Sequence, residues 1–63
     1  MLFRSLALAR NGDVEGARRE FRIGVRMDKG LLNEVQDDLA ALKRDLPAKA
    51  AQWDAILAEV KAL

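Results

Sequence analysis

Apolar residues recur at intervals of three and four along most of this chain, which is the spacing of one face of an α-helix. The segments are rich in strong helix formers such as Ala, Leu, Arg, Glu and Lys, and none of them alternates apolar and polar residues like a half-buried strand. The pattern is interrupted at Gly12-Asp13, Lys29-Gly30 and Leu46-Pro47. The sequence therefore predicts four helices, over residues 2–11, 14–27, 31–45 and 48–62.

The residues at the interruptions suit helix ends. Gly12 readily takes the left-handed conformation that ends a helix, and Asp13 then caps the next one. Pro47 fits the first turn of the fourth helix. Because the connections are short, each helix must pack antiparallel to the one before it. We expect an all-α fold of four short antiparallel helices in one small domain, arranged as two stacked hairpins, residues 1–29 and 30–63.

The fourth predicted helix carries two separate stripes. Its bulky stripe contains Trp53, and its second stripe consists of Ala51, Ala55, Ala58 and Ala62. A helix with two such stripes is typically contacted on two sides, and alanines allow a neighbouring helix to approach closely. Ala55, Ala62 and Trp53 are therefore candidates for self-association.

The second predicted helix divides into three sectors around its axis. Phe21 lies on one apolar face, and Ile23 and Met27 lie nearly opposite. The third sector is a stripe of four arginines: Arg18, Arg19, Arg22 and Arg26. Glu15 precedes the first two arginines by three and four residues, so we expect a solvated stripe that is partly paired with Glu15.

A short motif adds a resemblance to this pattern. Gly12-Asp13 is followed by Ala17-x-x-x-Phe21 and then by Gly24, and this stretch of residues 5–28 resembles a tetratricopeptide repeat. The family's closing proline is replaced by Lys29. At the family's repeat length of about 34 residues, Ala17 aligns with Ala51 and Gly24 with Ala58, but Phe21 aligns with Ala55. Residues 30–63 are therefore a degenerate second unit or a capping hairpin. The positions expected to pack between helices are Gly12, Ala17, Phe21, Gly24, Ala51 and Ala58.

The resemblance also implies a function. Repeats of this kind recognise a peptide or a subunit in a groove lined mainly by the first helix of each pair. The corresponding residues here are Arg4, Leu8, Asn11, Asp37, Asp38 and Ala41. We expect a non-enzymatic protein–protein interaction or assembly module, which belongs to a larger complex or forms a homo-oligomer. Because such arrays need about three repeats, we also expect this unit to be the end of a longer array or to complete its core on a partner.

Composition limits the chemistry available. The 63 residues include no Cys, His, Thr or Tyr, so disulfides, common zinc sites and most catalytic nucleophiles and bases are excluded. We identify no cofactor or metal site and expect no enzymatic activity. The apolar runs are too short to span a membrane, which takes about 20 residues, and we expect a cytoplasmic protein without membrane insertion.

Charge leaves one alternative function open. Residues 1–30 carry seven basic and four acidic side chains, a charge of +3, whereas residues 31–63 carry four basic and six acidic ones, a charge of −2. The alternative is a nucleic-acid-binding domain that uses the arginine stripe. The net charge of only +1, the carboxylates of Glu15 and Glu20 near the stripe and the lack of interleaved aromatic residues argue against nucleic acid as the partner.

Overall fold

The computed structural model describes residues 3–63, so the first helix's predicted start at Leu2 lies outside the described residues. The α-helices are α1 (Phe3–Arg10), α2 (Val14–Met27), α3 (Leu32–Asp45) and α4 (Ala50–Lys61). The 3-10 turns η1 (Lys29–Leu31) and η2 (Pro47–Lys49) lead into α3 and α4. Residues 3–63 contain no strand, and the prediction of an all-α chain with four helices is confirmed.

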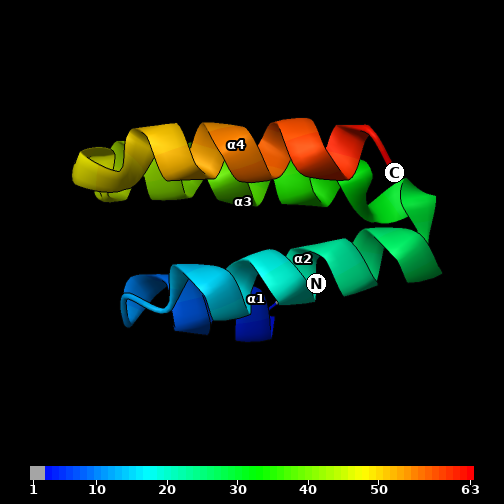
Figure 1. Cartoon of the computed structure of the whole chain (residues 1–63), viewed down its shortest axis with the longest axis horizontal. Helices are drawn as coiled ribbons and strands as arrows, with labels where there is room; N and C mark the ends of the chain where they lie inside the picture. Colours follow the sequence, from blue (N-terminus) through cyan, green and yellow to red (C-terminus); the bar gives the residue numbers. More distant parts are fainter. Residues whose placement is uncertain (1–2) are drawn as a thin grey trace.

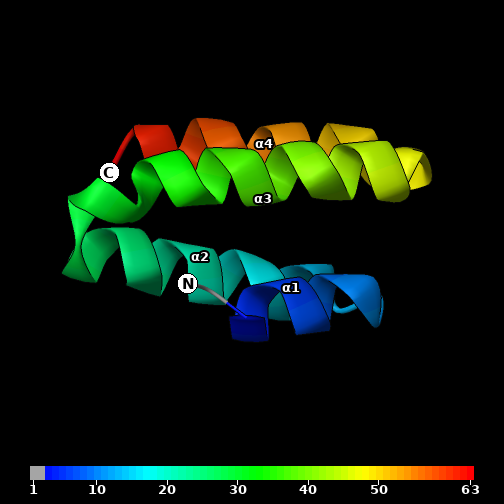
Figure 2. The ribbon, with the colours of Figure 1, turned by 180° about the vertical axis from the view of Figure 1, so that it is seen from behind.

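The helices form two hairpins that stack on each other. Helices α1 and α2 make the first hairpin, and α3 and α4 make the second, which lies above it in Figure 1. Both views show α4 over α2 and α3 over α1, with the stacked helices running in the same direction (Figures 1 and 2). The predicted pair of stacked hairpins therefore describes the arrangement, and the core lies between the two layers.

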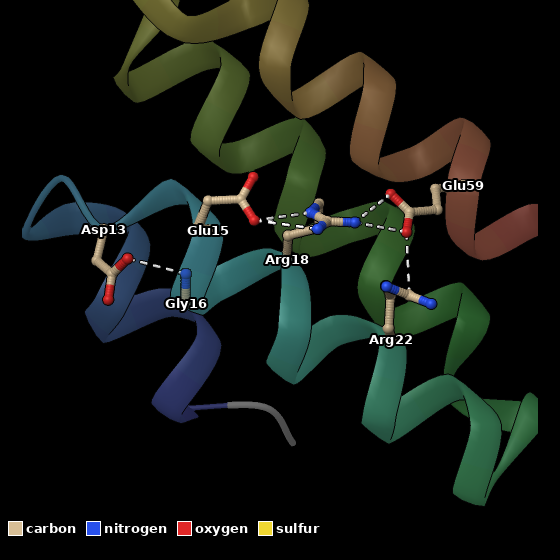
Figure 3. Close-up of polar contacts among 6 residues, drawn as sticks. All are labelled: Asp13, Glu15, Gly16, Arg18, Arg22 and Glu59. Atoms are coloured by element: carbon tan, nitrogen blue, oxygen red, sulfur yellow. Dashed lines mark hydrogen bonds and ion pairs between the residues drawn. The ribbon is translucent and has the colours of Figure 1, made fainter.

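Local hydrogen bonds explain where α2 begins and ends. Gly12 has a φ of +89°, the left-handed region that favours glycine, and it reverses the chain between α1 and α2. The Asp13 carboxylate accepts a hydrogen bond of 2.8 Å from the Gly16 amide (Figure 3) and so caps α2. After α2 the Asp28 carboxylate accepts a bond of 2.9 Å from the Gly30 amide, which favours the η1 turn. As a result α3 begins slightly later than predicted.

The core is built from apolar residues of all four helices. Trp53 and Phe21 are its two largest side chains, and the Trp53 indole N–H donates to the Leu46 carbonyl at 3.2 Å. The fully buried apolar side chains are Ala9, Ala17, Phe21, Val25, Val35, Leu39, Leu42, Trp53, Ile56 and Val60. Gly24 is buried as well, so the predicted packing positions of α2 lie inside the molecule. The prediction of Gly12 as a packing position is wrong, because Gly12 lies exposed in the turn between α1 and α2.

Three predictions for α4 are wrong within this fold. Trp53 is only 1% exposed, so its side chain is not available for self-association. Ala51 and Ala58 are exposed, not packed between stacked helices. The physical reason is that the bulky stripe of α4 points into the core and places the alanines on the opposite face. Ala55 and Ala62 share this exposed face, and their role in self-association stays a prediction.

Ser5 is a buried polar side chain that leads to a testable expectation. It is 1% exposed, and its hydroxyl finds no hydrogen-bond partner among the described residues. An unsatisfied buried hydroxyl costs free energy, so Ser5→Ala is expected to leave the free energy of unfolding unchanged or to raise it by about 1 kcal/mol. Urea denaturation followed by circular dichroism measures the change. Ala7→Ser, at an exposed position of the same helix, reports the propensity difference alone. A clear loss of stability in Ser5→Ala would contradict the expectation.

Candidate partner-binding surface

The arginine stripe of α2 is divided between two environments. Arg18 and Arg22 face the second hairpin, where both reach Glu59 of α4 (Figure 3). Arg18 Nη1 donates to the two Glu59 carboxylate oxygens at 2.8 and 3.1 Å. Arg22 Nε lies 3.0 Å from Glu59 Oε1 and forms an ion pair without the alignment of a hydrogen bond. One carboxylate of α4 therefore holds two arginines of α2.

Glu15 completes this group of charges. Arg18 donates to Glu15 Oε2 from Nε at 3.2 Å and from Nη2 at 3.0 Å, so the predicted pairing of Glu15 with Arg18 is confirmed. Hydrogen bonds to Glu15 and then to Glu59 raise the pKa of Arg18, which therefore stays charged. We refer to Glu15, Arg18, Arg22 and Glu59 as the inter-hairpin cluster.

The expectation of a solvated arginine stripe is wrong for Arg18 and Arg22. Their side chains and that of Glu59 are only about one third exposed, because they meet where the two hairpins stack. The periodicity of α2 can predict ion pairs within that helix. It cannot predict the pair with Glu59, which lies 41 positions after Arg18 in the sequence. The sequence of α4 gives only a weak indication that Glu59 lies near the other hairpin: it directly precedes Val60, which is buried.

The inter-hairpin cluster leads to a second testable expectation. Glu59→Gln keeps the size of the side chain but removes the charge that holds two partly covered arginines. We expect a lower urea midpoint at low salt, and a smaller loss as salt screens the attraction. Glu15→Gln removes a carboxylate that lies within one helix and is the matched control. Equal losses in both variants would show that the contact between the hairpins adds nothing beyond the local pair.

Arg19 and Arg26, the other two members of the stripe, lie on the side of the first hairpin away from the core. Both are exposed, and Ile23 between them is 50% exposed. Met27, one turn further along, is 82% exposed. These two are the large apolar side chains that the described part of the chain leaves exposed.

Two adjoining hollows mark this side of the first hairpin. A hollow of about 340 Å³ is lined by Arg4, Leu8, Asp13, Gly16, Arg19, Glu20 and Ile23. A hollow of about 170 Å³ is lined by Arg19, Arg22, Ile23 and Arg26. Arg19 and Ile23 line both hollows, so we refer to the two together as the outer groove, which lies between α1 and α2 at the larger hollow and along α2 alone at the smaller one.

The outer groove contains two of the six predicted partner-binding residues, Arg4 and Leu8. Arg4 is exposed, and its Nε forms an ion pair of 3.2 Å with Glu20 Oε1. Leu8 is half-buried and packs against the core. The groove around them is completed by α2, not by the first helix of the second hairpin. Asn11 is exposed at the end of the first hairpin, in the turn after α1.

The other three predicted partner-binding residues lie on α3, in the second hairpin. Asp37 is exposed, whereas Asp38 and Ala41 are half-buried. Burial, together with the negative charges of Glu34 and Asp37, raises the pKa of Asp38. These residues contribute none of the side chains that line the outer groove.

A further ion pair joins the two hairpins on the side of α1 and α3. Arg10 Nη1 and Nη2 each lie 3.3 Å from Asp45 Oδ2. Hydrogen bonds from Arg44 and from Arg10 lower the pKa of Asp45, so the carboxylate keeps its charge below the usual titration range of an aspartate. Both partners are exposed, so this pair contributes little to stability.

The described residues bring together no group of three or more His, Cys, Asp or Glu side chains with the geometry to hold a metal ion. Each helix within residues 3–63 falls short of the length and apolar character that a membrane span requires. Comparisons of the chain with protein-family models, with curated proteins and with solved structures found no match.

Proposed function

We propose that this chain is a non-enzymatic interaction module that docks a partner protein on the outer groove of its first hairpin. The observation that carries the proposal is the exposure of Ile23, which lines both hollows, and of Met27 one turn further along α2. Single exposed apolar side chains are common in soluble proteins. Two of them on one helix strip next to a groove are typical of surfaces that receive a helix or peptide.

The stacked hairpins support a role in assembly. Ala17, Phe21 and Gly24, the positions that carry the resemblance to a tetratricopeptide repeat, are buried as that repeat would require. We therefore propose a TPR-like unit whose partner is a subunit of a larger complex. The docking surface is the outer groove, which lies on the face of the first hairpin that the second hairpin does not cover.

The residue types support a non-enzymatic role. The chain has no His, Cys, Thr or Tyr, and its one hydroxyl, that of Ser5, is buried. The carboxylates near the arginines of α2 are engaged in ion pairs: Glu15 and Glu59 with Arg18, and Glu20 with Arg4. Little is left for acid–base or nucleophilic chemistry, which needs a nucleophile and base within hydrogen-bond reach in a pocket.

Photo-cross-linking in the source cells tests this proposal. A benzophenone amino acid replaces Ile23 or, separately, Met27, and both positions are expected to give a discrete product with another protein. Ala55, which is exposed on the second hairpin, is the control position and should not give that product. Identical products at all three positions, or none at Ile23 and Met27, would contradict the proposal. A product between two copies at Ala55 would support self-association through the alanine face.

A further inference from the structure

The outer groove carries positive charge that the fold does not neutralise. Among the described residues, Arg19 and Arg26 have no ion-pair partner, whereas Arg4 is held by Glu20. The remaining arginines of α2 belong to the inter-hairpin cluster. Ile23 follows Arg19 by four residues and precedes Arg26 by three, so the three side chains lie along one strip of α2. This strip therefore combines unpaired positive charge with exposed apolar surface.

The shape of the strip suits a protruding side chain. Arg19 and Ile23 line both hollows, so the two hollows adjoin at these side chains. Met27 lies four residues after Ile23 and extends the apolar line by one turn. A partner helix with apolar residues at intervals of three and four would place its side chains along the same line.

We infer that the outer groove binds an acidic amphipathic helix of the partner protein. Apolar side chains of that helix cover Ile23 and Met27, and its carboxylates pair with Arg19 and Arg26. This inference rests on the proposed function and adds the chemistry of the partner. Charge complementarity carries it, because unpaired arginines beside apolar surface favour an occupant that brings carboxylates along with apolar anchors.

Other occupants fit the groove less well. A two-fold contact between copies would place the same patch on both sides and bring arginines against arginines. A nucleic-acid backbone offers phosphates for the arginines but no apolar side chains to cover Ile23 and Met27. A bilayer surface is flat and would leave the hollow unfilled.

The test is a selection from displayed random 16-residue peptides. The library is selected for binding to the wild-type chain, and peptides that also bind the Ile23→Asp, Met27→Asp double variant are discarded. Both replaced residues are exposed, so this variant should fold. The expected peptides are acidic, with apolar residues spaced at three and four. Fluorescence anisotropy then gives their dissociation constants.

A pair of charge variants identifies the contacts. The Arg19→Gln, Arg26→Gln double variant should bind the selected peptides about fivefold or more weakly than the wild type at low salt. The difference in affinity should be smaller at high salt. Arg44→Gln with Lys61→Gln removes the same charge from exposed positions of the second hairpin and should change binding by less than about twofold. Equal losses in both variants would overturn the inference.

The remaining outcomes separate the inference from the proposed function. Groove-dependent peptides that are neutral or basic would overturn the acidic partner but leave docking at the groove intact. The absence of groove-dependent peptides, with cross-links still formed at Ile23, would overturn it in the same way. The selection could also return no acidic peptides while the chain binds phosphatidylserine vesicles or duplex DNA. If that binding is lost in the Arg19→Gln, Arg26→Gln variant, the ligand of the groove is a lipid or a nucleic acid, and the inference is overturned. Failure of both the selection and the cross-linking would overturn the proposed function itself.

Discussion

Trp53→Ala is expected to remove about half or more of the free energy of unfolding of this chain. Trp53 is the largest fully buried side chain and lies in the core with residues of α2 and α3. Replacing a buried Trp by Ala costs about 3–5 kcal/mol. At about 0.05–0.15 kcal/mol per residue, a chain of this length has about 3–9 kcal/mol of stability in total. We therefore expect a large fall in the urea midpoint, measured by circular dichroism.

Trp53→Phe is the matched control for this experiment. It keeps an aromatic ring in the core but removes the indole N–H that donates to the Leu46 carbonyl at 3.2 Å. We expect a folded variant with a lower urea midpoint, at a cost of about 1–3 kcal/mol for the smaller ring and the unpaired carbonyl. A Trp53→Ala variant that unfolds cooperatively near the wild-type midpoint would show that the core does not depend on this side chain.

The helices could be predicted from the sequence because their determinants are local. Gly12 and Asp13 act within a few residues of one another, as the left-handed turn and the cap bond to Gly16 show. In α3 the apolar residues Val35, Leu39 and Leu42 follow one another at intervals of four and three, which is likewise a property of one helix, and all three are buried. Because the connections between the helices are short, antiparallel hairpins were the expected arrangement.

The candidate surface could be predicted only in part. The pattern of α2 placed Ile23 and Met27 on a second apolar face, nearly opposite Phe21, but it did not show that this face is left exposed. It did not separate Arg19 from Arg18, which lie on neighbouring sectors of the same helix. That separation depends on Glu59, which belongs to the other hairpin. Contacts between layers depend on how the hairpins stack, and the periodicity of a single helix contains no information on stacking.

The small residues show the same limit. Both Ala17 and Ala58 were predicted as packing positions, but Ala17 is fully buried and Ala58 is exposed. A helix with two apolar stripes predicts two contacts, yet it does not show whether a second neighbour is present. Burial of the bulky stripe removes more apolar area from water, so Trp53 of α4 faces the core and the alanines face outward.

Ala17→Leu and Ala58→Leu form a pair of variants that measures this difference. At Ala17 the added carbons enter a filled site, so we expect the free energy of unfolding to fall by about 1–3 kcal/mol. The melting temperature should fall with it, by about 4–8 °C for each kcal/mol in a chain of this size. At Ala58 the leucine extends into open space, and the expected change is within about 0.5 kcal/mol. Thermal and urea denaturation of the two variants give both values.

The dependence of the Ala58→Leu midpoint on protein concentration tests whether copies of the chain associate through the alanine face of α4. If the alanine face of α4 is free, the variant unfolds like the wild type at every protein concentration. If copies of the chain pair through this face, the midpoint of the wild type rises with protein concentration. A bulky residue at Ala58 then disturbs the contact, so the midpoint of the variant falls below that of the wild type by more at high concentration. Equal destabilisation by both variants at low concentration would mean that Ala58 is packed within one chain. Such a result would contradict the stacking of the two hairpins, because that stacking places the alanine face of α4 outside the core.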